Sequence, residues 1–296
     1  MSERFSHVLN VIAQDASALA AKLRGLGEAL WLSPGRAFDI RIAGDAQAAL
    51  AEARSLGHNA DINVVATAQR RKKLLIADMD STIIGCECLD ELADMAGLKE
   101  RVSAITERAM RGEIEFASAL RERVALLRGL PLAAFEKTYR ERVKLNPGAA
   151  ALVATMKKHG ARSCLVSGGF TYFTSRVAAL AGFDDQQANT LRDDGTALTG
   201  EVAEPILGRE AKLAALEAEV AALGISFAET LAVGDGANDL DMIKRAGLGV
   251  AYHAKPVVAA AAGASIAHGD LTGLLYLQGY RDEEMVGGFE NFTPRR

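Results

Sequence analysis

Three short, uninterrupted apolar runs constrain the fold of this chain more than any other feature. They are Leu74–Ala77, Ser163–Val166 and Leu231–Val233, and weaker copies follow at Leu248–Ala251 and Ser265–Ala267. Continuous apolar runs of this length are typical of strands that are buried on both faces of a parallel sheet. Helical segments separate the runs along the chain. This alternation predicts an α/β class fold, a doubly wound parallel-sheet, Rossmann-like core.

Reactive side chains follow each of the three strongest runs. The first run leads into Asp78–Thr82, the second into Ser167–Gly169 and the third into Gly234–Asp239. In open α/β sheets, ligands bind outside the carboxyl ends of the strands. One acidic residue after a strand is common, whereas three polar or acidic clusters after three apolar runs are not. We therefore expect the three clusters to form one site.

The length of 296 residues leaves room for a second domain before the core. The order strand, helix, strand, strand, helix, strand in the first segment predicts a small ferredoxin-like α/β domain. The expected strands are His7–Ala13, Ala29–Leu32, Ala37–Ile42 and Ile62–Ala66, and the expected helices are Ser17–Leu26 and Ala46–Leu56. A basic run, Gln69–Lys73, follows and is interpreted as a solvated linker. The predicted accessory domain with its linker is 1–72, and the predicted core is 73–296.

A long and mostly helical stretch separates the first two buried strands. It runs from about Glu87 to Leu145, which is too long for a single crossover connection. We interpret it as a helical cap inserted at about residues 85–146 and ended by Asn146–Gly148. Further along the chain, Asp193–Thr196 predicts the turn of a hairpin in a small flap.

Composition and charge exclude several classes of protein. Hydrophobic residues make up 49% and charged residues 24%, which is ordinary for a globular protein. The net charge of -4 disfavours a generally basic, nucleic-acid-binding surface. The longest apolar stretches fall short of the roughly 18–20 residues that span a bilayer. Three cysteines are an odd number and favour free thiols in a reducing cytoplasm. We expect no nucleic-acid partner and no membrane partner.

The polar clusters resemble the motifs of the haloacid dehalogenase (HAD) superfamily of phosphatases. Four motifs occur in the right order from about Lys73 onward: Asp78-x-Asp80-x-Thr82, Ser167, Lys212 and Gly234-Asp235-Gly236-x-Asn238-Asp239. Glu87 and the segment Met110–Arg123 extend the resemblance to members that hydrolyse O-phosphoserine. The resemblance implies a Mg²⁺-dependent phosphatase that takes the small molecule O-phosphoserine and performs the last step of serine biosynthesis.

The resemblance also implies a role for each motif residue. Asp78 would be the nucleophile that forms an aspartyl-phosphate. Asp80 would protonate the leaving serine oxygen and then accept a proton from water. Mg²⁺ would lie between Asp78, the backbone carbonyl of Asp80 and Asp235, with Asp239 as a supporting carboxylate. The groups that would hold the phosphate oxygens are Lys212, which is also assigned to catalysis, Ser167, Gly168 and Asn238.

Substrate choice is expected to come from the inserted helices. Residues spaced three and four apart share one helix face, as do Phe116, Leu120, Arg123 and Leu127. From the pattern alone, Arg123 is a snorkelling arginine at the edge of an apolar stripe. The resemblance instead implies that Arg123 binds the substrate carboxylate as a fork and that Glu87 accepts from the substrate ammonium. Met110 and Phe116 would close over the substrate.

Other functions are less consistent with these residues. The alternative function is a HAD phosphatase of another small phosphorylated metabolite, which the pair of Glu87 and Arg123 argues against. A dehalogenase is disfavoured because a halide leaving group does not need the proton of Asp80.

A regulator that had lost catalysis is the alternative from another class, because the N-terminal segment resembles a degenerate, amino-acid-sensing ACT-type module. A regulator of this kind should lack at least one catalytic residue, yet none is missing among Asp78, Asp80, Lys212 and Asp235. This favours an enzyme with an accessory domain. That domain is suited either to packing against a second copy, giving a homodimer, or to binding a small effector.

Overall fold

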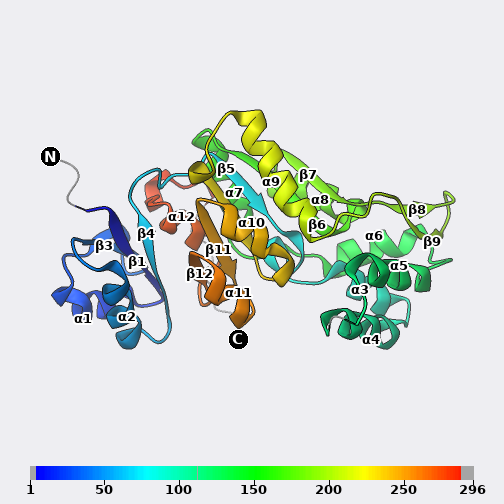
Figure 1. Cartoon of the computed structure of the whole chain (residues 1–296), viewed down its shortest axis with the longest axis horizontal. Helices are drawn as coiled ribbons and strands as arrows, with labels where there is room; N and C mark the ends of the chain where they lie inside the picture. Colours follow the sequence, from blue (N-terminus) through cyan, green and yellow to red (C-terminus); the bar gives the residue numbers. More distant parts are fainter. Residues whose placement is uncertain (1–4, 112, 288–296) are drawn as a thin grey trace.

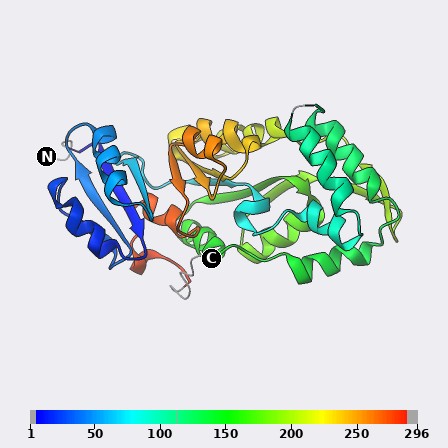
Figure 2. The ribbon, with the colours of Figure 1, turned by 90° about the horizontal axis from the view of Figure 1, so that it is seen from below.

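The computed structural model describes residues 5–111 and 113–287, and the side chain of Met110 also lies outside the description. Figure 1 shows a long molecule with a small α/β domain at one end, the large sheet in the middle and a group of helices at the other end. Figure 2 shows the same succession from below. None of the helices in the described ranges combines the length and the apolar character that a membrane crossing requires.

The N-terminal domain has the predicted ferredoxin-like arrangement. Its antiparallel sheet has the order β2-β3-β1-β4. The elements are β1 (His7–Ala13), α1 (Ala16–Lys22), β2 (Leu30–Ser33), β3 (Ala37–Ile42), α2 (Ala46–Leu56) and β4 (Ala60–Ala66). Helix α1 ends four residues earlier than predicted, and a 3₁₀ turn at Leu23–Gly25 follows it. The alternating side chains of β1 separate two cores, because Leu9 and Val11 face the helices while Val8 and Ile12 face the large domain.

The predicted doubly wound core is confirmed. Its parallel sheet has the order β12-β11-β10-β5-β6-β7. The strands are β5 (Leu74–Ala77), β6 (Arg162–Phe170), β7 (Asp185–Asn189), β10 (Thr230–Gly234), β11 (Leu248–Tyr252) and β12 (Ala264–Ile266). Two apolar clusters cover its two faces. One contains α7 (Ala149–Lys158), α8 (Thr171–Ala181) and α12 (Gly273–Leu277), and the other contains α9 (Arg209–Leu223), α10 (Leu240–Arg245) and α11 (Pro256–Ala261).

Strand β7 has no counterpart in the sequence prediction. Its five residues, Asp185–Asn189, are mostly polar, and β7 lies at the edge of the sheet. An edge strand needs less apolar surface than a central strand, so its sequence does not form an apolar run.

Helices α3 to α6 lie where the helical insertion is predicted, between β5 and α7. Their bounds are Cys88–Met95, Lys99–Met110, Phe116–Leu126 and Leu132–Arg142. The predicted hairpin is also present, as β8 (Leu191–Asp193) and β9 (Leu198–Val202). Its turn is held by the carboxylate of Asp194, which accepts from the N–H groups of Thr196 and Ala197. Strand β9 packs against α5, so the flap and the helical cap are in contact.

The basic run Gln69–Lys73 is only in part the solvated linker that the sequence predicts, because three of its residues are exposed whereas Arg70 and Lys72 are not. The guanidinium of Arg70 forms a two-bonded ion pair with Asp39 of β3, at 2.5 and 2.9 Å, and its Nε donates to the carbonyl of Leu277. Lys72 is buried, and its Nζ donates to the carbonyls of Gln69 and Ala228. Each buried cation is compensated by oxygens from distant segments, which a local charge pattern does not reveal.

Two side chains of β4 fasten the N-terminal domain to the edge of the large sheet. The amide of Asn63 bonds both backbone groups of Ser265 in β12, at 3.0 and 2.9 Å. The carboxylate of Asp61 accepts from three successive N–H groups, those of Ala267, His268 and Gly269. These side chains bond backbone groups of β12 and of the residues after it, as the backbone of a further strand would. The N-terminal domain therefore covers an edge that a core alone would expose.

Candidate active site

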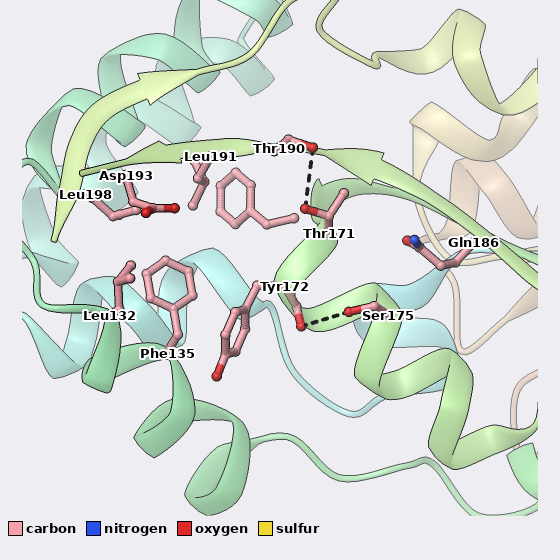
Figure 3. Close-up of a pocket in the computed structure, with 11 residues that line it drawn as sticks. Leu132, Phe135, Thr171, Tyr172, Ser175, Gln186, Thr190, Leu191, Asp193 and Leu198 are labelled. Carbon is pink, nitrogen blue, oxygen red and sulfur yellow. Dashed lines mark hydrogen bonds between the residues drawn. The ribbon is translucent and has the colours of Figure 1, made fainter. Parts of the chain in front are cut away.

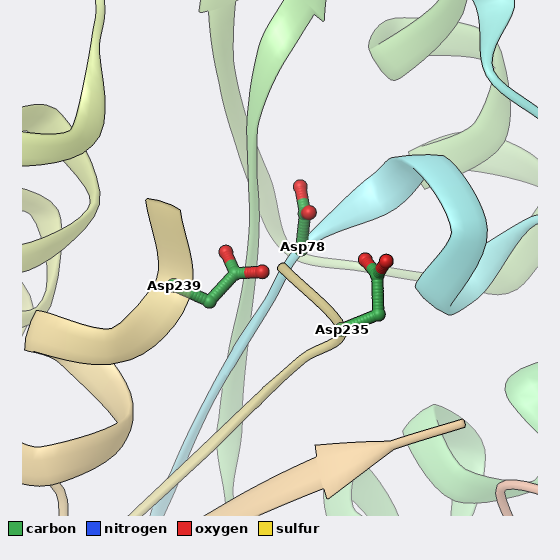
Figure 4. Close-up of side chains that lie close together, drawn as sticks. All are labelled: Asp78, Asp235 and Asp239. Carbon is green, nitrogen blue, oxygen red and sulfur yellow. The ribbon is translucent and has the colours of Figure 1, made fainter. Parts of the chain in front are cut away.

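The three polar clusters meet at the carboxyl ends of the strands, as the sequence predicts. Asp78 directly follows β5, Ser167 and Gly168 lie near the end of β6, and Asp235 directly follows β10. The N–H of Asp78 donates to the carbonyl of Val233, which fixes the first cluster beside the third. Figure 4 shows the carboxylates of Asp78, Asp235 and Asp239 gathered at this end of the sheet.

These three carboxylates form an acidic cluster in which Asp78 and Asp239 are buried and Asp235 is half-buried. One oxygen from each lies within 4.8 Å of the others. Burial and the charge of Asp239 raise the pKa of Asp235 to about 6. Burial also raises the pKa of Asp78 well above its usual range, although Lys212 opposes this. A methyl group on Gly234 would lie 2.3 Å from Cγ of Asp239, so glycine is needed there for the close approach. A cluster of hard oxygen donors whose negative charges repel one another fits a divalent cation.

Lys212 of α9 bridges two of these acids. Its side chain is 2% exposed, and its Nζ lies 2.7 Å from Oδ1 of Asp78 and 2.5 Å from Oδ1 of Asp239. Burial lowers the pKa of Lys212, but the two carboxylates outweigh it and raise the pKa above its ordinary value. Lys212 is therefore a buried ammonium beside the carboxylate of Asp78, where it is positioned to neutralise an anionic ligand.

Asp80 occupies the tight turn Met79–Ile83 after β5. Its Oδ1 accepts from the N–H of Cys88, and its Oδ2 lies 3.5 Å from Oγ of Ser167. Burial and the charge of Glu87 raise the pKa of Asp80 to about 7. A carboxyl group with this pKa can both donate and accept a proton near neutral pH.

Two side chains that the sequence analysis did not assign support this site. Nδ2 of Asn189 donates to the carbonyls of Gly168 and Leu207, at 2.9 and 3.1 Å, and so joins the β6 loop to the segment before α9. Asn189 gave no sequence signal because its strand, β7, was not predicted. The hydroxyl of Thr82 lies 3.3 Å from Oδ1 of Asp235. Thr82 was part of the first motif, but no role followed from the pattern.

The cap and the last motif bring further predicted residues to this region. Glu87 is the N-cap residue of α3 and accepts a 2.6 Å hydrogen bond from Oγ of Ser81. Phe116 begins α5, and its ring lies over Gly168, where an added methyl group would be 3.3 Å from Cζ. Asn238 is exposed beside the acidic cluster. The predicted contact of the Met110 side chain lies outside the described residues.

Arg123 of α5 is a half-buried cation without a carboxylate at contact distance. Its Nε lies 3.2 Å from the carbonyl of Ala119, and its Nη1 lies 3.4 Å from Oγ1 of Thr106. Among the residues that the structure describes, no carboxylate oxygen lies within 4.0 Å of its guanidinium. Burial lowers its pKa, and the more distant charges of Asp90 and Glu87 oppose this. An incompletely neutralised guanidinium of this kind is suited to binding an anion.

A separate cavity of about 360 Å³ lies between the cap helix α6, the start of α8 and the hairpin β8–β9. Figure 3 shows the rings of Phe135 and Tyr172 on one side of it and the side chains of Leu191 and Asp193 on the other. None of the predicted site residues lines this cavity. The acidic cluster, rather than this cavity, is therefore the candidate active site.

Comparison with known proteins gives the class first. The family model described as haloacid dehalogenase-like hydrolase matches residues 75–244. The chain is also 49% identical over 210 residues to the phosphoserine phosphatase of a Polaromonas species, covering 69% of this chain and 89% of that protein. The chain therefore belongs to the haloacid dehalogenase-like hydrolases and, within them, to the phosphoserine phosphatase family.

Solved structures agree with this family. A probable phosphoserine phosphatase from Vibrio cholerae matches with a TM-score of 0.80 and 30% identity, covering 94% of this chain and 88% of that one. A substrate-bound phosphoserine phosphatase complex matches with a TM-score of 0.65 and 38% identity, covering 70% of this chain and 98% of that one. The first match extends over the N-terminal domain as well as the core.

Proposed function

We propose that this protein hydrolyses O-phosphoserine to serine and phosphate through an aspartyl-phosphate on Asp78, as the last step of serine biosynthesis. The observation that supports this proposal is that two groups of charged residues, one in the core and one in the cap, suit the two ends of the same substrate. The acidic cluster with the buried Lys212 suits a phosphate, and the cap above it carries the incompletely neutralised Arg123 and the carboxylate of Glu87. A phosphorylated amino acid offers a complementary charge to each of them.

The acidic cluster can hold a divalent cation, and Mg²⁺ is the proposed ion. Its ligands would be Asp78, the backbone carbonyl of Asp80 and Asp235. Asp239 is assigned a supporting role because its Oδ1 is engaged by Lys212 and its Oδ2 by the N–H of Gly236. When bound, Mg²⁺ neutralises charge on the phosphoryl oxygens and polarises the phosphorus.

The chain's own residues account for the nucleophilic and proton-transfer steps. An oxygen of Asp78 attacks phosphorus, and the bond between phosphorus and the serine oxygen breaks. Asp80 donates the proton that the leaving serine oxygen needs. Asp80 then takes a proton from the water that hydrolyses the acyl phosphate. Lys212, Ser167, Asn238 and the N–H of Gly168 hold the phosphate oxygens.

The cap binds the carboxylate and ammonium groups of the substrate. Arg123 binds the carboxylate, and Glu87 accepts from the ammonium group. Phe116, which already packs on Gly168, and Met110 exclude water from the phosphate. A sugar phosphate or a nucleotide lacks the ammonium and carboxylate together, so these two residues favour phosphoserine over the alternative substrates.

Three further assignments belong to the proposal. The N-terminal domain is an ACT-like accessory domain, the protein associates as a homodimer, and it works in the cytoplasm. The ferredoxin-like sheet order supports the first assignment, and the three free cysteines support the last. Sedimentation equilibrium tests the dimer, and a single monomeric species would contradict it.

A substrate panel tests the activity. Phosphate release is measured from phosphoserine, sugar phosphates and nucleotides, with and without Mg²⁺. We expect phosphoserine to be preferred, activity to disappear with a chelator and to return with Mg²⁺, and Ca²⁺ to inhibit because it takes more ligands. Preference for a sugar phosphate or a nucleotide would favour the alternative function, and full activity in excess chelator would contradict the metal.

Replacing the arginine of the cap separates recognition from chemistry. Arg123→Ala is expected to weaken kcat/KM for phosphoserine by about 2–5 kcal/mol, because a substrate carboxylate is left unpaired. A small generic phosphate ester such as p-nitrophenyl phosphate should be affected far less. Equal losses on both substrates would show that Arg123 holds the cap together and does not bind the substrate.

A further inference from the structure

The guanidinium of Arg123 is held by oxygens from two cap helices. The first is the carbonyl of Ala119, one turn earlier in α5, at 3.2 Å from Nε. The second is the hydroxyl of Thr106 in α4, at 3.4 Å from Nη1. Helices α4 and α5 pack against each other, so the two oxygens approach the guanidinium from different elements. Two contacts at different nitrogens fix both the position and the plane of the group.

The hydroxyl of Thr106 is oriented to accept. Its own hydrogen is donated to the carbonyl of Val102, one turn earlier in α4, at 3.1 Å. A hydroxyl has one donor and two acceptor sites, so its lone pairs are left for Arg123. The N–H of Arg123 therefore meets an acceptor that cannot turn away without breaking a second hydrogen bond.

The rest of the guanidinium is available. Within residues 5–111 and 113–287, neither a hydrogen bond from Nη2 nor a carboxylate within 4.0 Å of the group is present. A two-bonded contact to a carboxylate needs a planar fork that already points at it. The hydrogen bond from Arg123 to Thr106 therefore leaves the guanidinium ordered and able to bind an anion.

We propose that Thr106 is a positioning residue that sets the orientation of Arg123 for the substrate carboxylate and so contributes to substrate specificity. This inference rests on the proposed function, in which Arg123 binds that carboxylate. Thr106 itself does not touch the substrate. Its hydrogen bond involves a charged group, and the loss of such a bond costs enough to weaken binding of the carboxylate about fivefold to twentyfold.

Two substitutions at this position test the role. Thr106→Val keeps the shape of the side chain and removes the acceptor, whereas Thr106→Ser keeps the hydroxyl. The substrates are O-phosphoserine and O-phosphoethanolamine, which has the same phosphate and ammonium groups but no carboxylate. We expect Thr106→Val to lower kcat/KM for phosphoserine about fivefold to twentyfold, mainly through KM, with little change on phosphoethanolamine. Thr106→Ser should stay within about twofold of the wild type.

Thr138 provides a matched control. It lies in cap helix α6, it is buried, and its hydroxyl donates to the carbonyl of Ala134 one turn earlier, as Thr106 does in α4. Thr138→Val removes the same kind of hydrogen bond away from Arg123. It should leave the preference for phosphoserine unchanged, and its melting temperature shows how much the loss of such a bond costs the fold.

Several outcomes would overturn the proposal. They are an equal loss on both substrates with Thr106→Val, an unchanged KM for phosphoserine, and a loss with Thr106→Ser as large as with Thr106→Val. In the Arg123→Ala background, Thr106→Val should have no further effect, and an additive loss would also contradict it. If Arg123→Ala itself affects both substrates equally, the proposed role of Arg123 fails, which is a different result from failure of Thr106 alone.

Discussion

The candidate active site and the junction between the domains both contain buried ions, but they balance charge differently. At the candidate active site, Asp80 lies near the acidic cluster of Asp78, Asp235 and Asp239, and the ammonium of Lys212 contacts two of these carboxylates, Asp78 and Asp239. At the junction, the carboxylate of Asp39 meets the guanidinium of Arg70 in a two-bonded pair that also reaches backbone carbonyls. The first region carries an excess of negative charge, whereas in the second the carboxylate of Asp39 is paired with the cation of Arg70.

This difference distinguishes a ligand-binding site from an ion pair that stabilises the fold. Excess buried charge is unfavourable by itself, and it is tolerated where a cation or a substrate completes the set. Burial first, and then the charge of a neighbouring carboxylate, raises the pKa values of Asp78, Asp80 and Asp235. A complete pair instead becomes unfavourable only when one partner is removed. Substitutions in the two regions should therefore separate activity from stability.

The largest effect is expected at Asp78, the proposed nucleophile. Asp78→Asn should abolish turnover and phosphorylation of the protein, because an amide is a poor nucleophile and a poor Mg²⁺ ligand. The same change removes one excess negative charge, so the free energy of unfolding should fall by no more than about 1 kcal/mol. Phosphate release and urea denaturation measure the two effects. Substantial turnover by this variant would contradict the mechanism.

The opposite pattern is expected at the junction. Arg70→Met leaves the buried Asp39 without its cation and should lower the free energy of unfolding by about 3–5 kcal/mol. The kcat and KM of the protein that remains folded should stay within about twofold of the wild type. Adding Asp39→Asn removes the uncompensated charge and should recover part of the stability. A loss of activity in a folded Arg70→Met protein would show that the junction supports the active site.

Substitution of Asp80, the proposed general acid and base, should give an intermediate effect. Asp80→Asn should lower kcat about a hundredfold or more, because the leaving oxygen loses its proton donor. Binding of Mg²⁺, measured by calorimetry, should change little, since the proposed ligand from Asp80 is its backbone carbonyl. A large loss of Mg²⁺ affinity would mean that the carboxylate of Asp80 is itself a ligand.

The smallest effect concerns the charge that reaches Asp80 from the cap. Glu87 is an anion near Asp80 and raises the pKa of that carboxyl group, which lies at about 7. Glu87→Gln removes the charge and keeps the size, so the pKa of Asp80 should fall. Asp80 would then be less protonated at pH 7. Carbon-13 NMR titration of the metal-free protein measures this shift, and an unchanged or higher pKa would contradict the coupling.

Much of the fold could be predicted because it depends on local patterns. The buried run Leu74–Ala77 predicted β5 with the observed bounds, and the N-terminal pattern predicted the order of the ferredoxin-like domain. The polar edge strand β7 could not be found in this way, because few of its side chains are buried. Arg70 and Lys72 of the basic run were misinterpreted for a related reason, because their oxygen partners in Asp39, Leu277 and Ala228 come from distant parts of the chain.

The sequence by itself determined the chemical groups and the order in which they follow the strands, because each of Asp78, Ser167 and Asp235 follows an apolar run that forms a strand of one parallel sheet. Only the tertiary structure decided which charges are left without a partner. Asp39 and Arg70 lie 31 positions apart and neutralise each other, whereas Arg123 meets a hydroxyl in place of a carboxylate. Electrostatic energy depends on the distance between charges and on their burial. The same residue type, arginine, therefore forms a structural ion pair at position 70 and is available to bind an anion at position 123.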